Sequence, residues 1–249
     1  AQESRGLGDV YKRQELYSLK KYIETGEQFA IIRRWGDDFK GKRGATMFDS
    51  IVANEEIKKL TKGEWTDIYY YSSRWFLCRY EDDKRIVDVK PLAYGFSLSA
   101  MEHDKSTSYP GITTIIFDEF LTRSGYLQNE FVLFMNVIST IARLRTNIKI
   151  FMLGNTVNQY CPYFDEMGLY RVRKMKQGDI DVYEYGNSEL KVAVEYCESL
   201  SNKGKKNSNF LFAFENPKLE MITTGTWEMD IYPHCPFKYK SNEIIRHIL

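Results

Sequence analysis

Gly111-Ile-Thr-Thr-Ile-Ile-Phe-Asp-Glu-Phe120 is the stretch that decides the fold of this 249-residue chain. Residues 112–117 are all β-branched or aromatic, which is typical of a parallel strand buried on both faces. Asp118 and Glu119 follow at the carboxyl end of this strand, the edge where open α/β sheets bind their ligands. An apolar strand that ends in Asp-Glu is typical of a Walker B motif, in which one acid helps to hold Mg²⁺ and the next orients a water. A buried strand followed by a solvated acidic turn would give the same pattern.

The composition of the chain is that of an ordinary globular protein, with 43% hydrophobic and 28% charged residues. The net charge is only +1, so any contact with nucleic acid must come from local patches or from repetition in a ring. No apolar run approaches the roughly 20 residues that span a bilayer, and we therefore expect no membrane association. The four cysteines lie far apart without a CxxC pair, which predicts free thiols in a reducing compartment.

The beginning of the chain has glycines that invite comparison with a phosphate-binding loop. Gly6 and Gly8 are the candidate nucleotide-binding residues there. A P-loop needs a glycine five places before its last glycine, followed by Lys and then Ser or Thr. Those places hold Glu3, Asp9 and Val10, and an acid in place of the lysine would repel phosphates. We expect residues 1–14 to be either non-native sequence or a degraded P-loop segment, without a competent P-loop.

The rest of the chain alternates between helical and strand-like patterns. The strand at 111–120, a helix at 129–145 and a strand at 148–153 form a predicted βαβ unit with polar residues at both carboxyl strand ends. This alternation predicts an α/β fold. The other predicted elements are helices at 15–24 and 47–60, strands at 29–32, 67–80 and 86–98, and, less regularly, a strand at 179–185 and a helix at 191–196.

Several motifs keep a fixed order around the Asp-Glu strand. These are TGEQFAIIRRW (25–35), KSTSYP (105–110), Arg143-Leu-Arg145, Gly154-Asn155-Thr156-Val157 and Cys161-Pro-Tyr-Phe164. Together with ITTIIFDEF they resemble the DNA-packaging (encapsidation) ATPases of phi-29-type podoviruses, over roughly residues 15–170.

The resemblance implies a P-loop NTPase-like fold of the additional-strand, ring-forming type, with a mostly parallel sheet flanked by helices. It also implies ATP and Mg²⁺ as cofactors. By resemblance, Asp118 would hold Mg²⁺ through water, and Glu119 would be the catalytic base that positions the attacking water. The intact Walker A motif of that family is missing here.

The resemblance assigns further roles to residues outside the Asp-Glu strand. Arg143 matches an arginine finger that acts on the ATP of the neighbouring subunit, and Arg145 is the second candidate. Asn155 would sense the γ-phosphate, and Lys105 is a weaker candidate for control in trans. Each has a plainer interpretation: the arginines would complement a helix dipole, Asn155 would be a turn residue and Lys105 a solvated lysine.

Partners and domain division also follow from the resemblance. It implies a homo-oligomeric ring that handles double-stranded DNA without reading its sequence, with a portal (connector) and a packaging RNA, on the procapsid in the host cytoplasm. Residues 15–198 would form the ATPase domain, 199–209 a basic linker and 210–249 the start of a small, mixed or antiparallel nuclease-like domain. A different P-loop DNA translocase and a catalytically dead P-loop-like structural module remain the alternatives.

Overall fold

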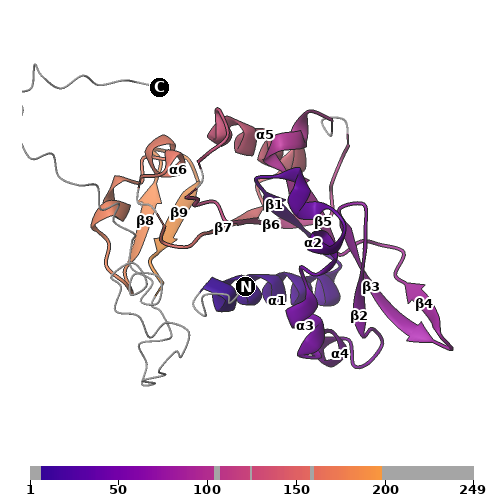
Figure 1. Cartoon of the computed structure of the whole chain (residues 1–249). Coiled ribbons are helices and arrows are strands. Elements are labelled where there is room, and N and C mark those ends of the chain that lie inside the picture. Colours follow the sequence, from indigo (N-terminus) through magenta and orange to yellow (C-terminus); the bar gives the residue numbers. More distant parts are fainter. Residues whose placement is uncertain (1–6, 104–106, 124, 158–159, 198–249) are drawn as a thin grey trace, which may run out of the picture.

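The structure, a computed structural model, describes residues 7–103, 107–123, 125–157 and 160–197. A central sheet lies between helix α1 (Leu7–Thr25) on one face and helix α5 (Glu130–Ala142) on the other, as Figure 1 shows. A small two-stranded sheet, β8 (Ile180–Glu184) with β9 (Lys191–Glu195), lies at the side of the molecule near α6. Residues 1–6, 104–106 and 198–249, which include Gly6, Lys105 and both predicted C-terminal segments, lie outside the described residues.

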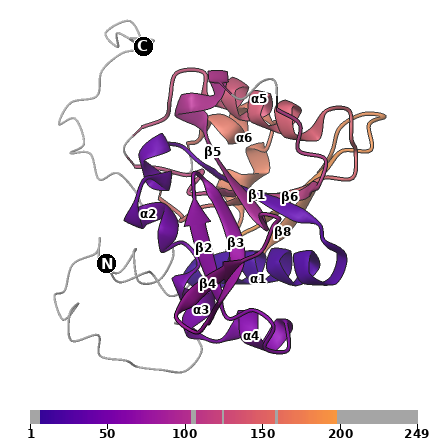
Figure 2. The ribbon, with the colours of Figure 1, turned by 90° about the vertical axis from the view of Figure 1, so that its right-hand side faces the viewer.

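Seven strands form the central sheet, in the order β2-β3-β5-β1-β6-β7 with β4 paired to β3. The neighbours β5, β1, β6 and β7 are parallel, whereas β2, β3 and β4 extend the sheet in antiparallel fashion (Figure 2). The predicted α/β class with its parallel core is therefore confirmed. The bounds of the strands are β1 Gln28–Arg33, β2 Asp67–Tyr71, β3 Arg74–Glu81, β4 Lys84–Val87, β5 Ala93–Ser97, β6 Ile112–Asp118 and β7 Lys149–Leu153.

Short helices fill the connections between the strands. The α-helices are α2 Lys42–Ala45, α3 Asp49–Ala53, α4 Glu56–Leu60 and α6 Pro162–Glu166; the 3₁₀ helices are η1 Gly36–Phe39, η2 Leu98–His103 and η3 Tyr170–Lys174. Among the described residues no helix combines the length and the apolar character needed to cross a membrane.

Strand β6 is buried along its whole length, as its composition predicts. Because side chains alternate between the faces of a strand, Phe117 packs on the α5 side with Phe134, while Ile116 belongs to the α1 side with Leu19. Strand β1 alternates in the same way, so the two arginines at its end leave on opposite faces. Arg33 continues the α1 face and Arg34 the α5 face.

Some predicted elements differ from the observed ones because the backbone turns inside them. The single helix expected at 47–60 is interrupted at Glu55, whose φ of 56° is left-handed, and becomes α3 and α4. The strand expected at 67–80 folds back at Ser72 and Ser73, both with positive φ, into the hairpin of β2 and β3. The strand expected at 86–98 likewise divides into β4 and β5.

Two further predictions are wrong in element type or extent. The segment 191–196, expected as a helix, forms strand β9, because pairing with β8 and packing of Val192 and Val194 on the core outweigh its local pattern. Helix α1 begins at Leu7, so Gly8 lies in a helical turn and not in a loop. The helix predicted from residue 15 is thus eight residues longer at its amino end.

The packing of Phe117 predicts a large effect of truncation. The side chain is 0% exposed and contacts the rings of Phe134 and Tyr163. We expect Phe117→Ala to lower the free energy of unfolding in urea by about 3–5 kcal/mol. Tyr71→Ala, at a position that is 64% exposed, is the control and should change it by no more than about 0.5 kcal/mol. Equal effects of the two substitutions would contradict the observed core.

Candidate active site

The carboxyl ends of β1 and β6 bring one arginine against two acids. The strands are parallel neighbours with Ile32 opposite Phe117, so Arg33 lies beside Asp118 on the α1 face. The Arg33 guanidinium makes an ion pair with the Asp118 carboxylate, and its Nη1 lies 3.0 Å from Oε2 of Glu119. Asp118 is buried, whereas the side chain of Glu119 is 62% exposed. Arg33 therefore pairs with both acids at this edge of the sheet.

The electrostatics of this edge favour a bound cation. Burial, opposed by the charge of Arg33 and assisted by that of Glu119, raises the pKa of Asp118 to about 6. Burial also opposes the charge on Arg33, but Asp118, Tyr11 and Glu119 outweigh it, so the pKa of the guanidinium is raised. A carboxylate that burial destabilises in this way gains from a positive charge placed beside it. Arg33 supplies that charge here, and a metal ion would supply more.

The amino end of α1 lies at the same edge of the sheet. Helix α1 precedes β1 and runs antiparallel to it, so its first turns lie over the carboxyl ends of the strands (Figure 1). Tyr11 shows that this end of α1 lies near Asp118. Burial raises the pKa of its hydroxyl, and the nearby charges of Glu15 and Asp118 raise that pKa further. The positive end of a helix dipole attracts anions. Gly8 is in the first turn of α1.

The donor set fits Mg²⁺ that arrives together with a nucleotide. Mg²⁺ keeps several waters and is usually held by one or two carboxylates and the phosphates of a substrate. Asp118 and Glu119 offer those carboxylates, and within the described ranges no group of three or more His, Cys, Asp or Glu could hold a metal ion alone. The part of the site that would bind the nucleotide phosphates is less complete, since Asp9 and Val10 stand where a P-loop has Lys and then Ser or Thr.

A second glycine pattern, not considered in the sequence analysis, follows β1. Gly36, Gly41 and Lys42 have the spacing of a P-loop, but Arg43 stands where Ser or Thr must contact Mg²⁺. The segment forms η1 and the four-residue helix α2, and Lys42 and Arg43 are exposed. This pattern therefore supplies no magnesium ligand.

Asn155 lies at the same edge as the two acids. It follows β7, whose last residue Leu153 is opposite Asp118. Gly154 lets the chain pass close to the segment after β6, because a Cβ on it would meet Phe120 at 3.0 Å. Asn155 itself is exposed. The sheet edge thus brings together three of the predicted site residues.

The two candidate finger arginines lie at the opposite edge. Arg143 ends α5, is exposed, and its Nη2 donates to the Thr107 carbonyl at 3.0 Å. Arg145 donates to several backbone carbonyls, among them that of Ile112 at 2.7 Å, at the beginning of β6. The seven residues of β6 separate them from Asp118 by roughly 20 Å. Neither arginine can reach the acids of its own chain.

Three residues of this region were missed as a group by the sequence analysis: Arg34, Glu130 and Tyr163. Arg34 pairs with Glu130 through two hydrogen bonds, Nε to Oε2 at 2.8 Å and Nη2 to Oε1 at 2.9 Å. Tyr163 donates its hydroxyl to Glu130 Oε1 at 2.8 Å. An acid in the first turn of a helix usually complements the dipole, so the sequence held no signal that Glu130 is buried.

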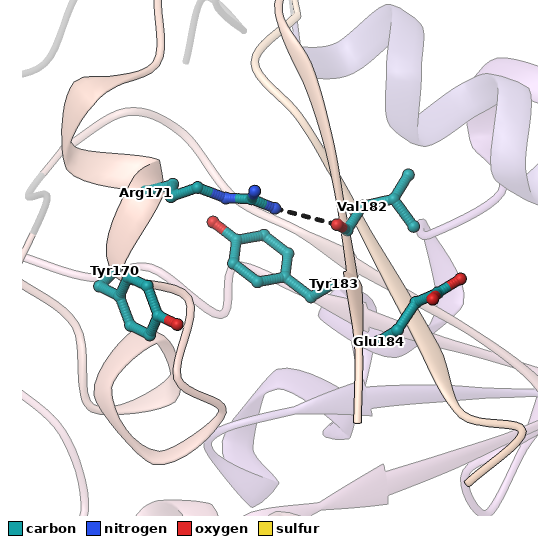
Figure 3. A pocket seen from close by; sticks show the side chains of 5 residues that line it. All are labelled: Tyr170, Arg171, Val182, Tyr183 and Glu184. Atoms are coloured by element: carbon teal, nitrogen blue, oxygen red, sulfur yellow. Dashed lines mark hydrogen bonds between the residues drawn. The ribbon is translucent and has the colours of Figure 1, made fainter. Parts of the chain in front are cut away.

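A pocket elsewhere on the molecule does not share these residues. Figure 3 shows it against η3 and β8, with a volume of about 390 Å³ and a lining of Tyr170, Arg171, Val182, Tyr183 and Glu184. The Arg171 guanidinium lies 4.5 Å from the centre of the Tyr183 ring and donates to the Val182 carbonyl at 2.9 Å. Its lining belongs to elements other than β1, β6 and α1, so it is separate from the Asp118 edge.

Comparison with known proteins places the chain among phage packaging proteins. The profile of the family described as podovirus DNA encapsidation protein (Gp16) matches residues 2–209. A DNA packaging protein of Bacillus phage B103 is 30% identical over 263 residues, which cover 92% of this chain and 74% of that protein. A DNA packaging protein of Bacillus phage phi29 is 27% identical over 165 residues, and there the match covers 65% of this chain and 43% of the relative's length.

Solved structures share the fold. The N-terminal domain of the DNA packaging ATPase from bacteriophage phi29 matches with a TM-score of 0.58 at 23% identity, over 80% of this chain and 88% of that one. The Phi-28 gp11 DNA packaging motor matches with a TM-score of 0.61 at 20% identity, over 95% of this chain and 66% of that one. At these identities the likeness concerns the fold alone.

The contacts of the two arginines at the far edge predict different costs of removal. We expect Arg145→Ala to lower the free energy of unfolding by about 2 kcal/mol, because it leaves several backbone carbonyls without their charged donor. Arg143→Ala, which removes one exposed contact, serves as the control and should cost no more than about 0.5 kcal/mol. Chemical denaturation of both variants makes the comparison. The reverse order would show that Arg145 does not hold the start of β6.

Proposed function

The chain belongs to the podovirus DNA encapsidation protein family, and on this premise we propose that it is an ATP-hydrolysing subunit of a motor that packages double-stranded viral DNA into a procapsid. One observation carries the ATPase part of the proposal. The acids Asp118 and Glu119 end a buried parallel strand directly beside the amino end of α1. This is the arrangement in which P-loop motors hold the phosphates of ATP and their metal ion.

Four of the described residues would have separate roles in ATP hydrolysis. Asp118 would hold Mg²⁺ through a water molecule, and bound Mg²⁺ would neutralise charge on the phosphates. Glu119, exposed at the mouth of the site, would orient the attacking water and accept its proton. Asn155, from the end of the neighbouring strand, would contact the γ-phosphate. Arg33 pairs with both acids and would have to release at least Asp118 for that carboxylate to serve the metal.

A homo-oligomeric ring would complete the site. Arg143 is exposed at the edge of the sheet opposite Asp118, so it can act only on the ATP of a neighbouring subunit. An arginine finger supplied in trans contributes roughly 10³ to 10⁵ in rate. Arg145, the second candidate, already donates to five backbone carbonyls and would help to position Arg143. Lys105 belongs to the segment before Thr107 and is proposed to assist Arg143.

Partners and domain division belong to the same proposal. DNA in the ring would be gripped through its phosphates without sequence reading, and the net charge of +1 fits transient contact. A portal and a packaging RNA are the further proposed partners, on the procapsid in the host cytoplasm. We assign residues 15–198 to the ATPase domain, 199–209 to a basic linker and 210–249 to a C-terminal domain. Residues 1–14, of which 7–14 form the beginning of α1, would be non-native sequence or a degraded P-loop segment.

The role of Glu119 gives the test of the proposal. In a version of the protein with a Gly-x-x-x-x-Gly-Lys-Ser/Thr loop ahead of α1, we expect Glu119→Gln to abolish steady-state ATP hydrolysis while ATP still binds. The amide keeps the shape of the side chain but cannot accept the proton. Glu184→Gln, on the exposed face of β8, is the control and should leave turnover unchanged. Turnover that persists in Glu119→Gln would remove this residue from catalysis, and an inactive parent protein would favour the dead structural module.

A further inference from the structure

We propose that Arg34, anchored by Glu130, is a positioning residue that fixes the backbone from which Glu119 reaches into the site. The inference rests on the proposed function, because the orientation of Glu119 matters for catalysis only if that residue acts on the attacking water. Its basis is the set of hydrogen bonds that the buried Arg34 guanidinium makes to the Glu130 carboxylate and to the backbone that follows β6.

Arg34 reaches the backbone that carries Glu119 directly. Its Nη1 donates to the carbonyl of Glu119 at 3.1 Å, and its Nη2 donates to the carbonyl of Phe120 at 2.9 Å. The amide of Phe120 donates in turn to the Leu153 carbonyl of β7 at 3.1 Å. Arg34 therefore holds two consecutive peptide units after β6, and the first of them, between Glu119 and Phe120, is also held from the β7 side.

The backbone of Glu119 needs such support. Its φ is 58°, in the left-handed region that costs residues other than glycine roughly 1–2 kcal/mol. Conformations of this kind persist only where the surrounding structure fixes them, and they gather at functional sites. With Asp118 in strand geometry and Glu119 left-handed, the chain leaves the strand at Glu119, and one guanidinium, that of Arg33, contacts both the buried Asp118 and the exposed Glu119.

Glu130 holds Arg34 in the orientation that this task requires. Both residues are buried, at 5% and 3% exposure, and the carboxylate also accepts from the Leu127 amide at 2.7 Å and from the Tyr163 hydroxyl at 2.8 Å. The ring of Tyr126 lies 5.2 Å from the guanidinium carbon. Four hydrogen bonds thus fix a carboxylate that itself makes no contact with the predicted site.

Stability alone does not account for this pair. Replacing a buried ion pair by apolar residues is often neutral or even stabilising, so burial of two charges is poor support for a purely structural role. A planar guanidinium, however, can donate to a carboxylate and to two carbonyls at once, which a lysine cannot do. The geometry that only arginine provides is directed at Glu119 and Phe120, which points to positioning.

Three variants separate positioning from stability. Arg34→Lys keeps the charge beside Glu130 but loses the fork of donors. Arg34→Met combined with Glu130→Met removes both charges and keeps an apolar core. Tyr185→Phe is the matched control, because it removes one tyrosine hydroxyl hydrogen bond, to the Met167 carbonyl at 2.8 Å, outside the Arg34 network. For each variant we would measure the thermal midpoint and the amide hydrogen exchange of peptides covering residues 117–123. ATP affinity and kcat would be measured in the P-loop-bearing version of the protein.

Both Arg34 variants should lose roughly 10²-fold in kcat, as a displacement of about 1 Å can cause, with ATP affinity nearly unchanged. Exchange should accelerate at residues 119–121 in these variants only. Tyr185→Phe should leave kcat and this exchange unchanged. Unchanged kcat in a folded Arg34 variant, or unchanged exchange, would overturn the positioning role. Turnover that survives Glu119→Gln would instead count against the proposed function, so the two failures are distinguishable.

Discussion

The buried ion pair between Arg34 and Glu130 is the contact on which the arrangement of the site depends. It joins the end of β1, the start of α5, the segment after β6 and, through Tyr163, the helix α6. Every oxygen of Glu130 and every nitrogen of Arg34 has a partner within 3.1 Å. A fully satisfied buried network of this kind specifies one geometry, because any other would leave a charge unpaired in a low dielectric. Glu119, the acid directly after β6, owes its place to this network.

Two adjacent arginines have different tasks because a strand alternates its faces. Arg34 enters the α5 layer, where each of its three side-chain nitrogens donates a hydrogen bond, while Arg33 faces α1 and pairs with the acids directly. At the other edge of the sheet, Arg145 holds the start of β6 and leaves Arg143 exposed at the surface. One sheet thus presents acids at one edge and an exposed arginine at the other. A ring would bring the two edges of neighbouring chains together.

The sequence predicted the α/β class, β6, α5 and the Asp118 edge, because a continuous buried strand and an amphipathic helix carry strong local signals. It failed where long-range contacts decide. Strand β9 exists through its pairing with β8, and Glu130 is buried only because Arg34 approaches from a strand 96 residues away. Left-handed residues such as Glu55 and Glu119 carry no signal of their own, since neither is glycine. The position of two acids at a strand end could be predicted from the sequence, but the contacts that orient them could not.

The composite site is the central claim, and complementation between two inactive chains tests it most directly. Glu119→Gln chains keep Arg143, and Arg143→Ala chains keep Glu119, so a random ring of both contains intact composite sites at about a quarter of its interfaces if the finger acts in trans. ATP hydrolysis by P-loop-bearing chains is measured as the two variants are mixed. We expect each variant alone to be inactive and mixing to restore activity, with a maximum near equal proportions. Mixtures that stay inactive at every ratio would contradict it, because two residues acting within one chain cannot complement each other.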